Sequence, residues 1–322
     1  MLVARNRSRC LHARHARLLT ALVWILLCGP AIALAQETLA QRAPVPRAII
    51  LPPTVVAGAQ ATLAVVDGAG RLLPGVAVEI SVGQTGAGSA ASPLEKVTTD
   101  ATGRATFLAP GDPGAMVAKI SDRRITISST AAVEKEPPPQ AGPADDASIV
   151  KISSYPRFLA VLDRFTIEGR GFRGAADSNR VFLGDQPCLV VASSPVSLVI
   201  VPGVHIPIGS IALRVRAGGS DAGPMPVTGV LLDFTGPADA PTAGAEGKLI
   251  LHVHGTTEPL TVEVRNGSPE IVQLVRGNLQ RLGTSGGEQN IAPVELKFLA
   301  SGNYVVTARL VGPDASNSRG GN

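Results

Sequence analysis

The chain has 322 residues, with 29 Lys and Arg, 25 Asp and Glu, and a formal net charge of +4. Five of the Arg but no acidic residue lie within residues 1–35, so the remaining chain carries 24 basic and 25 acidic residues, a net charge of −1. A nearly neutral chain without a basic block offers no electrostatic footprint for nucleic acid or anionic lipid. We therefore expect no nucleic acid as a partner.

The N-terminal segment has the pattern of a signal peptide. Arg residues precede an apolar run from Leu18 to Leu34, and Ala33-Leu34-Ala35 forms a small-residue cleavage site. Gly29-Pro30 interrupts the run, which makes a membrane-spanning helix the poorer interpretation. We predict cleavage after Ala35 and export to the periplasm, cell surface or medium, with membrane contact only through the signal peptide before cleavage.

Few residues of the predicted mature chain are suited to redox chemistry or ring stacking. Cys188 is its only cysteine, because the other two cysteines and the single Trp lie within residues 1–35. No internal disulfide can form, so each domain depends on its hydrophobic core, and we expect Cys188 to be a small buried side chain. Absence of Trp weakens a carbohydrate-binding function, since sugar rings usually stack on exposed aromatic side chains.

Stretches rich in Pro, Gly and Ala divide the chain into three domains joined by semi-rigid linkers. Each domain contains short runs of Val, Ile and Leu between turn residues, which predicts an all-β protein of tandem immunoglobulin-like sandwiches followed by a small β-rich domain. After the signal peptide (1–35), the predicted segments are a linker at 36–47, domains at 48–133, 148–233 and 246–313, Pro-rich and acidic linkers at 134–147 and 234–245, and a disordered tail at 314–322.

The first domain shows strand-like runs and two matching turns. Asp67-Gly-Ala-Gly70 and Asp100-Ala-Thr-Gly103 each place Asp first and Gly fourth, which favours type I turns. With Pro74-Gly75-Val76 and Gly103-Arg104-Ala105-Thr106-Phe107, the segment resembles the bacterial Ig-like repeat of invasin and intimin type. The predicted strands are Ala61–Val66, Val76–Val82, Ala105–Leu108 and Met116–Ser121.

The second domain carries the most specific pattern. Phe165-Thr-Ile-Glu-Gly-Arg-Gly-Phe172, Asn179-Arg-Val-Phe-Leu-Gly184 and Cys188-Leu-Val-Val-Ala192 are similar to an IPT/TIG domain, which implies an immunoglobulin-like fold. Asp163-Arg164 stand where the family pattern has glycine, which puts the first turn in doubt. We expect Phe172 to fold back from the Gly-x-Gly turn into the core.

The third domain resembles no named family. Alternation at Lys248–His254 and Leu260–Val264 predicts a hairpin with a turn around Gly255–Pro259. Ser268-Pro269-Glu270 has the pattern of a helix N-terminus, and the apolar spacing of Ile271, Leu274, Val275, Leu279 and Leu282 predicts one short helix. Closing strands are expected at Val294–Phe298 and Tyr304–Leu310.

Two motifs suggest enzymes but lack the required context. Gly169-Arg-Gly171-Phe-Arg-Gly174 fits a dinucleotide fingerprint, yet another strand follows where the fingerprint needs a helix. Gly283-Thr-Ser285-Gly-Gly287 fits a nucleophile elbow, yet no histidine follows Ser285. We expect no catalytic residue and no cofactor.

Metal sites are also not expected. His252 and His254 alternate along one strand and would share a face, but two ligands do not make a site, and Glu258 or Glu263 would have to complete it. Asp67 and Asp100 are explained by their turns, and Asp145 and Asp146 by a solvated linker, without calcium.

The leading functional hypothesis is a non-catalytic, exported, modular protein that binds or adheres to another protein through sheet edges and loops, or serves as a spacer. One alternative is an accessory subunit of an envelope secretion or pilus apparatus. Another, from a different class, is a metal-dependent enzyme or hydrolase seated in the third domain near His252 and His254.

Overall fold

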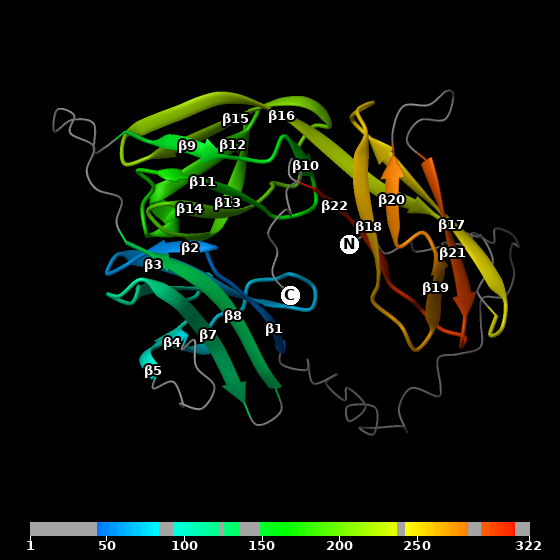
Figure 1. Ribbon diagram of the computed structural model, residues 1–322, viewed down its shortest axis with the longest axis horizontal. Helices are drawn as coiled ribbons and strands as arrows, with labels where there is room; N and C mark the ends of the chain where they lie inside the picture. Colours follow the sequence, from blue (N-terminus) through cyan, green and yellow to red (C-terminus); the bar gives the residue numbers. More distant parts are fainter. Residues whose placement is uncertain are drawn as a thin grey trace, which may run out of the picture.

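The computed structural model describes residues 44–83, 93–122, 125–135, 149–236, 242–282 and 291–312. Within these ranges the regular structure is β, apart from the short 3-10 helix η2 (Ala176–Ser178), which confirms the predicted all-β class. The predicted signal peptide and tail lie outside the described residues, as does most of the Pro-rich linker. Buried apolar side chains form three large cores, and the strands around each core are called modules 1, 2 and 3 (Figure 1).

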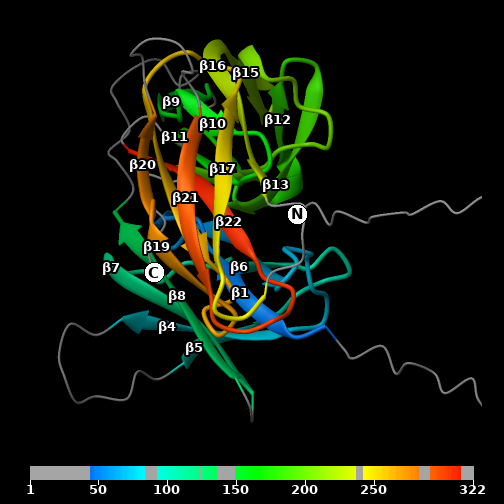
Figure 2. The ribbon, with the colours of Figure 1, turned by 90° about the vertical axis from the view of Figure 1, so that its right-hand side faces the viewer.

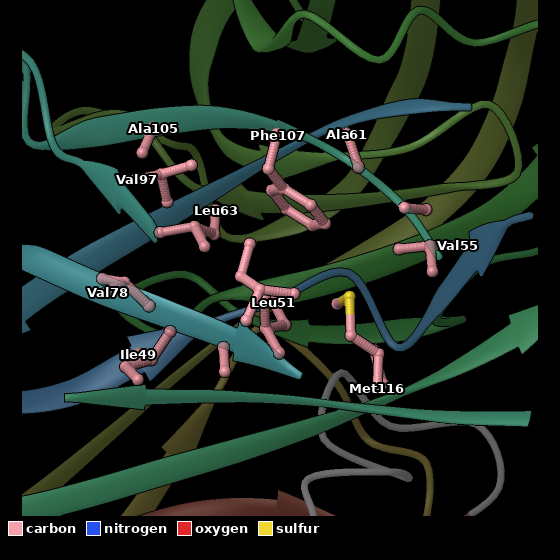
Figure 3. Packing of buried hydrophobic residues seen from close by; sticks show 14 of the residues in the cluster. Ile49, Leu51, Val55, Ala61, Leu63, Val78, Val97, Ala105, Phe107 and Met116 are labelled. Carbon is pink, nitrogen blue, oxygen red and sulfur yellow. The ribbon is translucent and has the colours of Figure 1, made fainter. Parts of the chain in front are cut away.

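Module 1 is a two-sheet sandwich. One sheet has the order β1-β3-β6 and the other the order β2-β8-β7-β4-β5. Leu51, Phe107 and Met116 point into the space between the sheets (Figure 3). All four predicted strands are confirmed. The strands are β1 (Pro46–Ile50), β2 (Thr54–Val56), β3 (Gln60–Asp67), β4 (Ala77–Gly83), β5 (Pro93–Thr98), β6 (Arg104–Leu108), β7 (Gly114–Asp122) and β8 (Ile125–Glu134).

Both predicted turns of module 1 form. The Gly70 N–H donates to the Asp67 carbonyl at 3.0 Å, and the Gly103 N–H donates to the Asp100 carbonyl at 2.9 Å. Gly103 has φ +76°, and a Cβ there would lie 2.7 Å from the Leu73 nitrogen. This turn therefore requires glycine both for its backbone conformation and for its close approach to the backbone at Leu73.

Module 2 is a second sandwich, in which β13 contributes to both sheets. One sheet runs β13-β14-β11-β9 and the other runs β13-β12-β15-β16, with β10 parallel to β16. Phe172 is only 3% exposed and lies in the core, as expected. The strands are β9 (Lys151–Ser154), β10 (Phe158–Ala160), β11 (Phe165–Arg170), β12 (Asn179–Leu183), β13 (Gln186–Ser193), β14 (Ser197–Val201), β15 (Gly209–Ala217) and β16 (Ser220–Thr235).

Module 3 pairs a sheet of order β19-β21-β17-β16 with a three-stranded sheet of order β20-β18-β22. Figure 2 shows β21 and β17 side by side on the face turned toward the viewer. The two expected closing strands are confirmed as β21 and β22. The strands are β17 (Glu246–His254), β18 (Leu260–Asn266), β19 (Val272–Arg276), β20 (Leu279–Leu282), β21 (Ile291–Phe298) and β22 (Val306–Val311).

The predicted helix after Ser268 is wrong, because this segment forms β19 and β20. The Ser268 carbonyl accepts hydrogen bonds from the N–H groups of Ile271 and Val272, which makes a single turn, and β19 then pairs with β21. Gly277 has φ +96° and separates the two strands, where a helix would have continued. The apolar spacing of this segment is compatible with a helix and with strands, and the pairing of β19 with β21 decides in favour of strands.

The predicted hairpin of module 3 is also wrong in its pairing, although both of its strands are present. β17 pairs with β16 and β21, whereas β18 pairs with β20 and β22, so the two strands lie in opposite sheets. Leu251 of β17 and Val262 of β18 both enter the core between those sheets. Alternation identified the buried face of each strand, but it carried no information about the partner strand.

Modules 1 and 2 pack directly against each other. β3 is buried on both faces: Leu63 and Val65 face the module 1 core, whereas Ala64 and Val66 join Val191 of module 2 in a separate apolar cluster. Ile50, Ala192 and Val199 complete this cluster, which we call the seam. A single β-bridge between Thr62 and Ser193 joins the sheets of the two modules across it.

Polar contacts hold the seam in register. The Gly174 carbonyl accepts hydrogen bonds from Thr62 Oγ1 at 2.7 Å and from Ser193 Oγ at 2.6 Å. Arg104 of module 1 donates to the Val190 carbonyl at 3.2 Å and pairs with Asp177 at 2.6 Å. The relative position of the two modules is therefore specified by buried contacts of both kinds.

Modules 2 and 3 share structure. β16 pairs with β15 over its first part and with β17 over its last five residues, so one strand runs through both modules (Figure 1). Phe158 and Ala160 of β10 and Val230 of β16 belong to the core of module 3. The core of the third module is thus completed by residues of β10 and β16, two strands that also belong to the second module.

Candidate binding surfaces

The glycine motif at 169–174 serves packing. Cβ atoms at Gly169 and Gly171 would lie 2.3 and 2.7 Å from the carbonyl oxygens of Lys151 and Ile149. A Cβ at Gly174 would lie 2.0 Å from the Gln60 carbonyl of module 1. Only the three-residue helix η2 follows, so the described chain offers no helix N-terminus for a pyrophosphate here. The motif places strand β11 against its neighbours and module 2 against module 1.

The two histidines lie side by side on the outer face of β17. Their rings stack with centroids 6.2 Å apart. His252 Nε2 lies 3.0 Å from Thr235 Oγ1, and His254 Nε2 lies 3.2 Å from Asp233 Oδ1. Cross-strand partners on β16 therefore occupy one ring nitrogen of each histidine.

The carboxylates that could have completed a metal site are engaged elsewhere. Glu258 pairs with Arg157, and Glu263 pairs with Arg265 and Arg309. The hydrogen bond from Arg309 is the main cause that lowers the pKa of Glu263. Across the part of the chain that the structure describes, no group of three His, Cys, Asp or Glu side chains is arranged to hold a metal ion.

The two turn aspartates are satisfied by their own turns. The backbone N–H of Arg71 is the main cause that lowers the pKa of Asp67, and the Thr102 hydroxyl does the same for Asp100. Asp67 Oδ1 also accepts from the Ala69 N–H at 2.8 Å. Asp145, Asp146 and the Gly283–Gly287 motif with Ser285 lie outside the described residues.

Cys188 lies on β13 opposite Val181, half-buried against the module 2 core. Burial raises the pKa of its thiol, which lowers the thiolate population at neutral pH. An apolar packing role matches this environment.

Two outermost strands leave backbone groups unpaired by their own sheets. Directly after β5, the Thr99 N–H donates to the Val76 carbonyl at 3.0 Å. Successive residues of an antiparallel strand direct their N–H groups to opposite sides, so the Lys96 N–H in β5 points away from β4. Directly before β20, the Asn278 carbonyl accepts a hydrogen bond from the Val264 N–H at 2.8 Å, so by the same alternation the Leu279 N–H points away from β18. The Leu279 side chain is 62% exposed. Both strands end their sheets among the described strands.

A hollow of about 420 Å³ lies where module 2 meets module 3, and we call it the junction cleft. The module 3 loop after β17 contributes Glu258, which pairs with Arg157 of module 2 at 2.5 Å. The Arg157 guanidinium also lies 5.2 Å from the centre of the Phe158 ring. The lining residues are Tyr155, Arg157, Ser210, Pro226, Val227, Thr228 and Glu258.

Sequence reasoning did not find the junction cleft. Arg157 and Glu258 are 101 residues apart and belong to no local motif. Ser210 and Thr228 are opposed across β15 and β16, which becomes visible only once the register of these strands is known. Within the described ranges, no helix has the length and apolar character needed to cross a bilayer.

Residues 148–228 match the family model for the IPT/TIG domain. This match confirms the resemblance carried by Phe165–Phe172 and Asn179–Gly184, and the chain contains an IPT/TIG domain. The match covers module 2 and ends within β16, before that strand reaches module 3. No curated protein sequence matches the chain.

Solved structures similar to the chain include the following three proteins. SGBP-B from a complex xyloglucan utilization locus in Bacteroides uniformis is 12% identical over 82% of this chain and 97% of that chain, with a TM-score of 0.27. Invasin, a bacterial integrin-binding protein, is 15% identical over 82% of this chain and 56% of that chain, with a TM-score of 0.19. The insect immune protein hemolin is 12% identical over 83% and 72%, with a TM-score of 0.24.

Proposed function

We propose that the chain is a non-catalytic, exported binding protein in which three modules form one fixed arm that presents open sheet edges and loops to a protein partner. The observation that carries the proposal is the fixed arrangement of the modules. The seam joins modules 1 and 2, and β16 and β10 join modules 2 and 3. Binding surfaces on different modules are therefore held at set distances, which lowers the entropy lost on binding.

Strand addition is the recognition mode that suits this arm. The outward N–H groups of Lys96 in β5 and Leu279 in β20 belong to outermost strands of modules 1 and 3. An extended segment of a partner gains affinity by pairing with such groups, and its alternate side chains give specificity. An exposed Leu279 side chain beside the edge adds apolar contact. The IPT/TIG domain in the middle serves as the rigid core of the arm.

The test begins with affinity capture from native envelope extract, using residues 36–322 as bait, followed by titration of the purified captured protein. Lys96→Pro and Leu279→Pro remove an outward N–H while sparing the internal ladder, because proline is tolerated at sheet edges. Lys96→Ala and Leu279→Ala are the matched controls that keep the N–H. We expect at least one proline variant to bind about tenfold more weakly than its alanine control.

Two outcomes would contradict the proposal. If no protein is captured, the arm is left with a spacer role. If a partner binds both proline variants as tightly as the wild type, recognition does not use these edges.

A further inference from the structure

The junction cleft lies apart from the strand edges of β5 and β20. Its volume of about 420 Å³ falls within the range of small-ligand sites, and such sites form preferentially between domains. Tyr155 and Pro226 supply apolar surface, and Val227 lies buried beneath. The ion pair between Arg157 and Glu258 borders the cleft, with side chains 57% and 47% exposed.

Three hydroxyl groups in the cleft lining are available to a ligand. No other described residue forms a hydrogen bond with the hydroxyls of Tyr155, Ser210 or Thr228, whereas most seam hydroxyls are bonded. Ser210 and Thr228 are direct cross-strand partners, so their side chains share one face of the sheet. Each hydroxyl can both donate and accept, which suits a ligand that carries hydroxyl groups itself.

The charge of the cleft lining favours an uncharged ligand. Arg157 and Glu258 neutralise each other, so an anion attracted by one would be repelled by the other. The pair nevertheless keeps hydrogen-bonding capacity, because a guanidinium has five N–H donors and a carboxylate has about four acceptor sites. Both side chains are about half exposed, so hydrogen-bonding sites that the ion pair does not use remain open to a ligand.

The strands of the cleft wall argue against an extended peptide. β15 is paired with β12 on one side and with β16 on the other. On the outer side of β16, the Thr228 N–H donates to the Arg157 carbonyl at 2.8 Å beside β10, and Pro226 has no N–H to offer. A peptide could not add there as a strand, since the backbone groups are already used. Recognition at this position must come from side chains.

We propose that the junction cleft binds a segment of neutral glycan. Ligand hydroxyls would bond to Tyr155, Ser210 and Thr228 and to the outer sites of the Arg157–Glu258 pair, while a sugar ring packs on Tyr155 and Pro226. The chain lacks Trp in its mature part, and Tyr155 supplies an aromatic surface at this site instead. The site is independent of protein binding at β5 and β20.

The test uses residues 36–322 and isothermal titration calorimetry with hexasaccharides of β-1,4-glucose, β-1,3-glucose, β-1,4-mannose, β-1,4-xylose and α-1,4-glucose, and with an oligogalacturonate as the charged probe. We expect at least one neutral hexasaccharide to bind with a Kd of about 1 mM or tighter, and the oligogalacturonate to bind more weakly. The double variant Ser210→Ala/Thr228→Val should weaken binding about fivefold or more, and Tyr155→Phe should weaken it less.

Ser153→Ala is the matched control, because this exposed serine lies on β9 of the same module and outside the cleft lining. It should bind as the wild type does, and the melting temperature of each variant shows whether the fold is intact. The proposal is overturned if no neutral hexasaccharide binds, if the charged probe binds more tightly than all of them, or if the Ser210/Thr228 double variant binds like the control.

Discussion

Gly174→Ala is the substitution that tests the seam most directly, because it changes neither module core. The new Cβ would lie 2.0 Å from the Gln60 carbonyl oxygen and 2.5 Å from its carbon. Both atoms belong to the module 1 backbone, so the modules must move apart or shift. Movement would also break the hydrogen bonds from Thr62 and Ser193 to the Gly174 carbonyl.

The expected loss follows from these contacts. Two buried hydrogen bonds contribute about 1 kcal/mol each, and forced overpacking costs about 1–3 kcal/mol. The free energy of unfolding should therefore fall by about 3–5 kcal/mol. With a urea m-value of about 2 kcal/mol per molar, the first unfolding transition should move to lower urea by about 2 M.

The assay is urea denaturation of residues 36–322 followed by circular dichroism, with solution X-ray scattering of the native state. We expect the variant to show an earlier transition and a larger radius of gyration than the wild type. Gly111→Ala is the control, because a Cβ at Gly111 meets no atom within 4 Å, and its effect should stay within about 0.5 kcal/mol. A Gly174→Ala chain that unfolds at the wild-type urea concentration would refute the role given to the seam.

Four further predictions follow from the cores and the sequence. Phe172→Ala should lower the free energy of unfolding by about 3–5 kcal/mol in urea denaturation of the whole chain, because the ring is 3% exposed in the module 2 core. Residues 246–313 alone should show no cooperative thermal transition, whereas 148–313 should fold, because Phe158, Ala160 and Val230 complete the module 3 core. Burial raises the pKa of Asp163, so its ionisation destabilises the fold as pH rises above about 3.8; Asp163→Asn should raise the melting temperature at pH 7 and leave it unchanged near pH 3. Mass spectrometry of the exported protein should find Gln36 as the first residue, and an intact Met1 would refute cleavage after Ala35.

Strand positions could be predicted because each strand has its own local signal. Four of the eight strands of module 1 and the motif strands of module 2 were found from apolar runs and turn residues. β3 carried a further signal, since its apolar run from Leu63 to Val66 does not alternate and the strand is buried on both faces. A continuous apolar run indicates that both faces of a strand are buried, but it does not identify what packs on them. The second face of β3 packs against module 2.

Pairing between distant strands could not be predicted. The apolar spacing after Ser268 fits both a helix and two strands, and only the partner β21 decides between them. β17 and β18 are close in sequence, yet a Cβ at Gly255 between them would lie 2.3 Å from the Gly229 carbonyl of module 2. That loop packs on another module as it crosses between sheets, so its path depends on contacts absent from the local sequence.

The junction cleft exists only while modules 2 and 3 keep their relative position, so the source of that position matters for its binding function. The Arg157–Glu258 pair spans the two modules, but half-exposed ion pairs contribute only about 0–1 kcal/mol. Burying the Phe158 side chain, which is 4% exposed, contributes about 1.5–3 kcal/mol, and Ala160 and Val230 add to it in the same core. Apolar burial therefore sets the position of the modules, and the ion pair remains available to a ligand. Because apolar burial holds modules 2 and 3 in place, a neutral ligand can bond to Arg157 and Glu258 without a change in the relative position of the two modules.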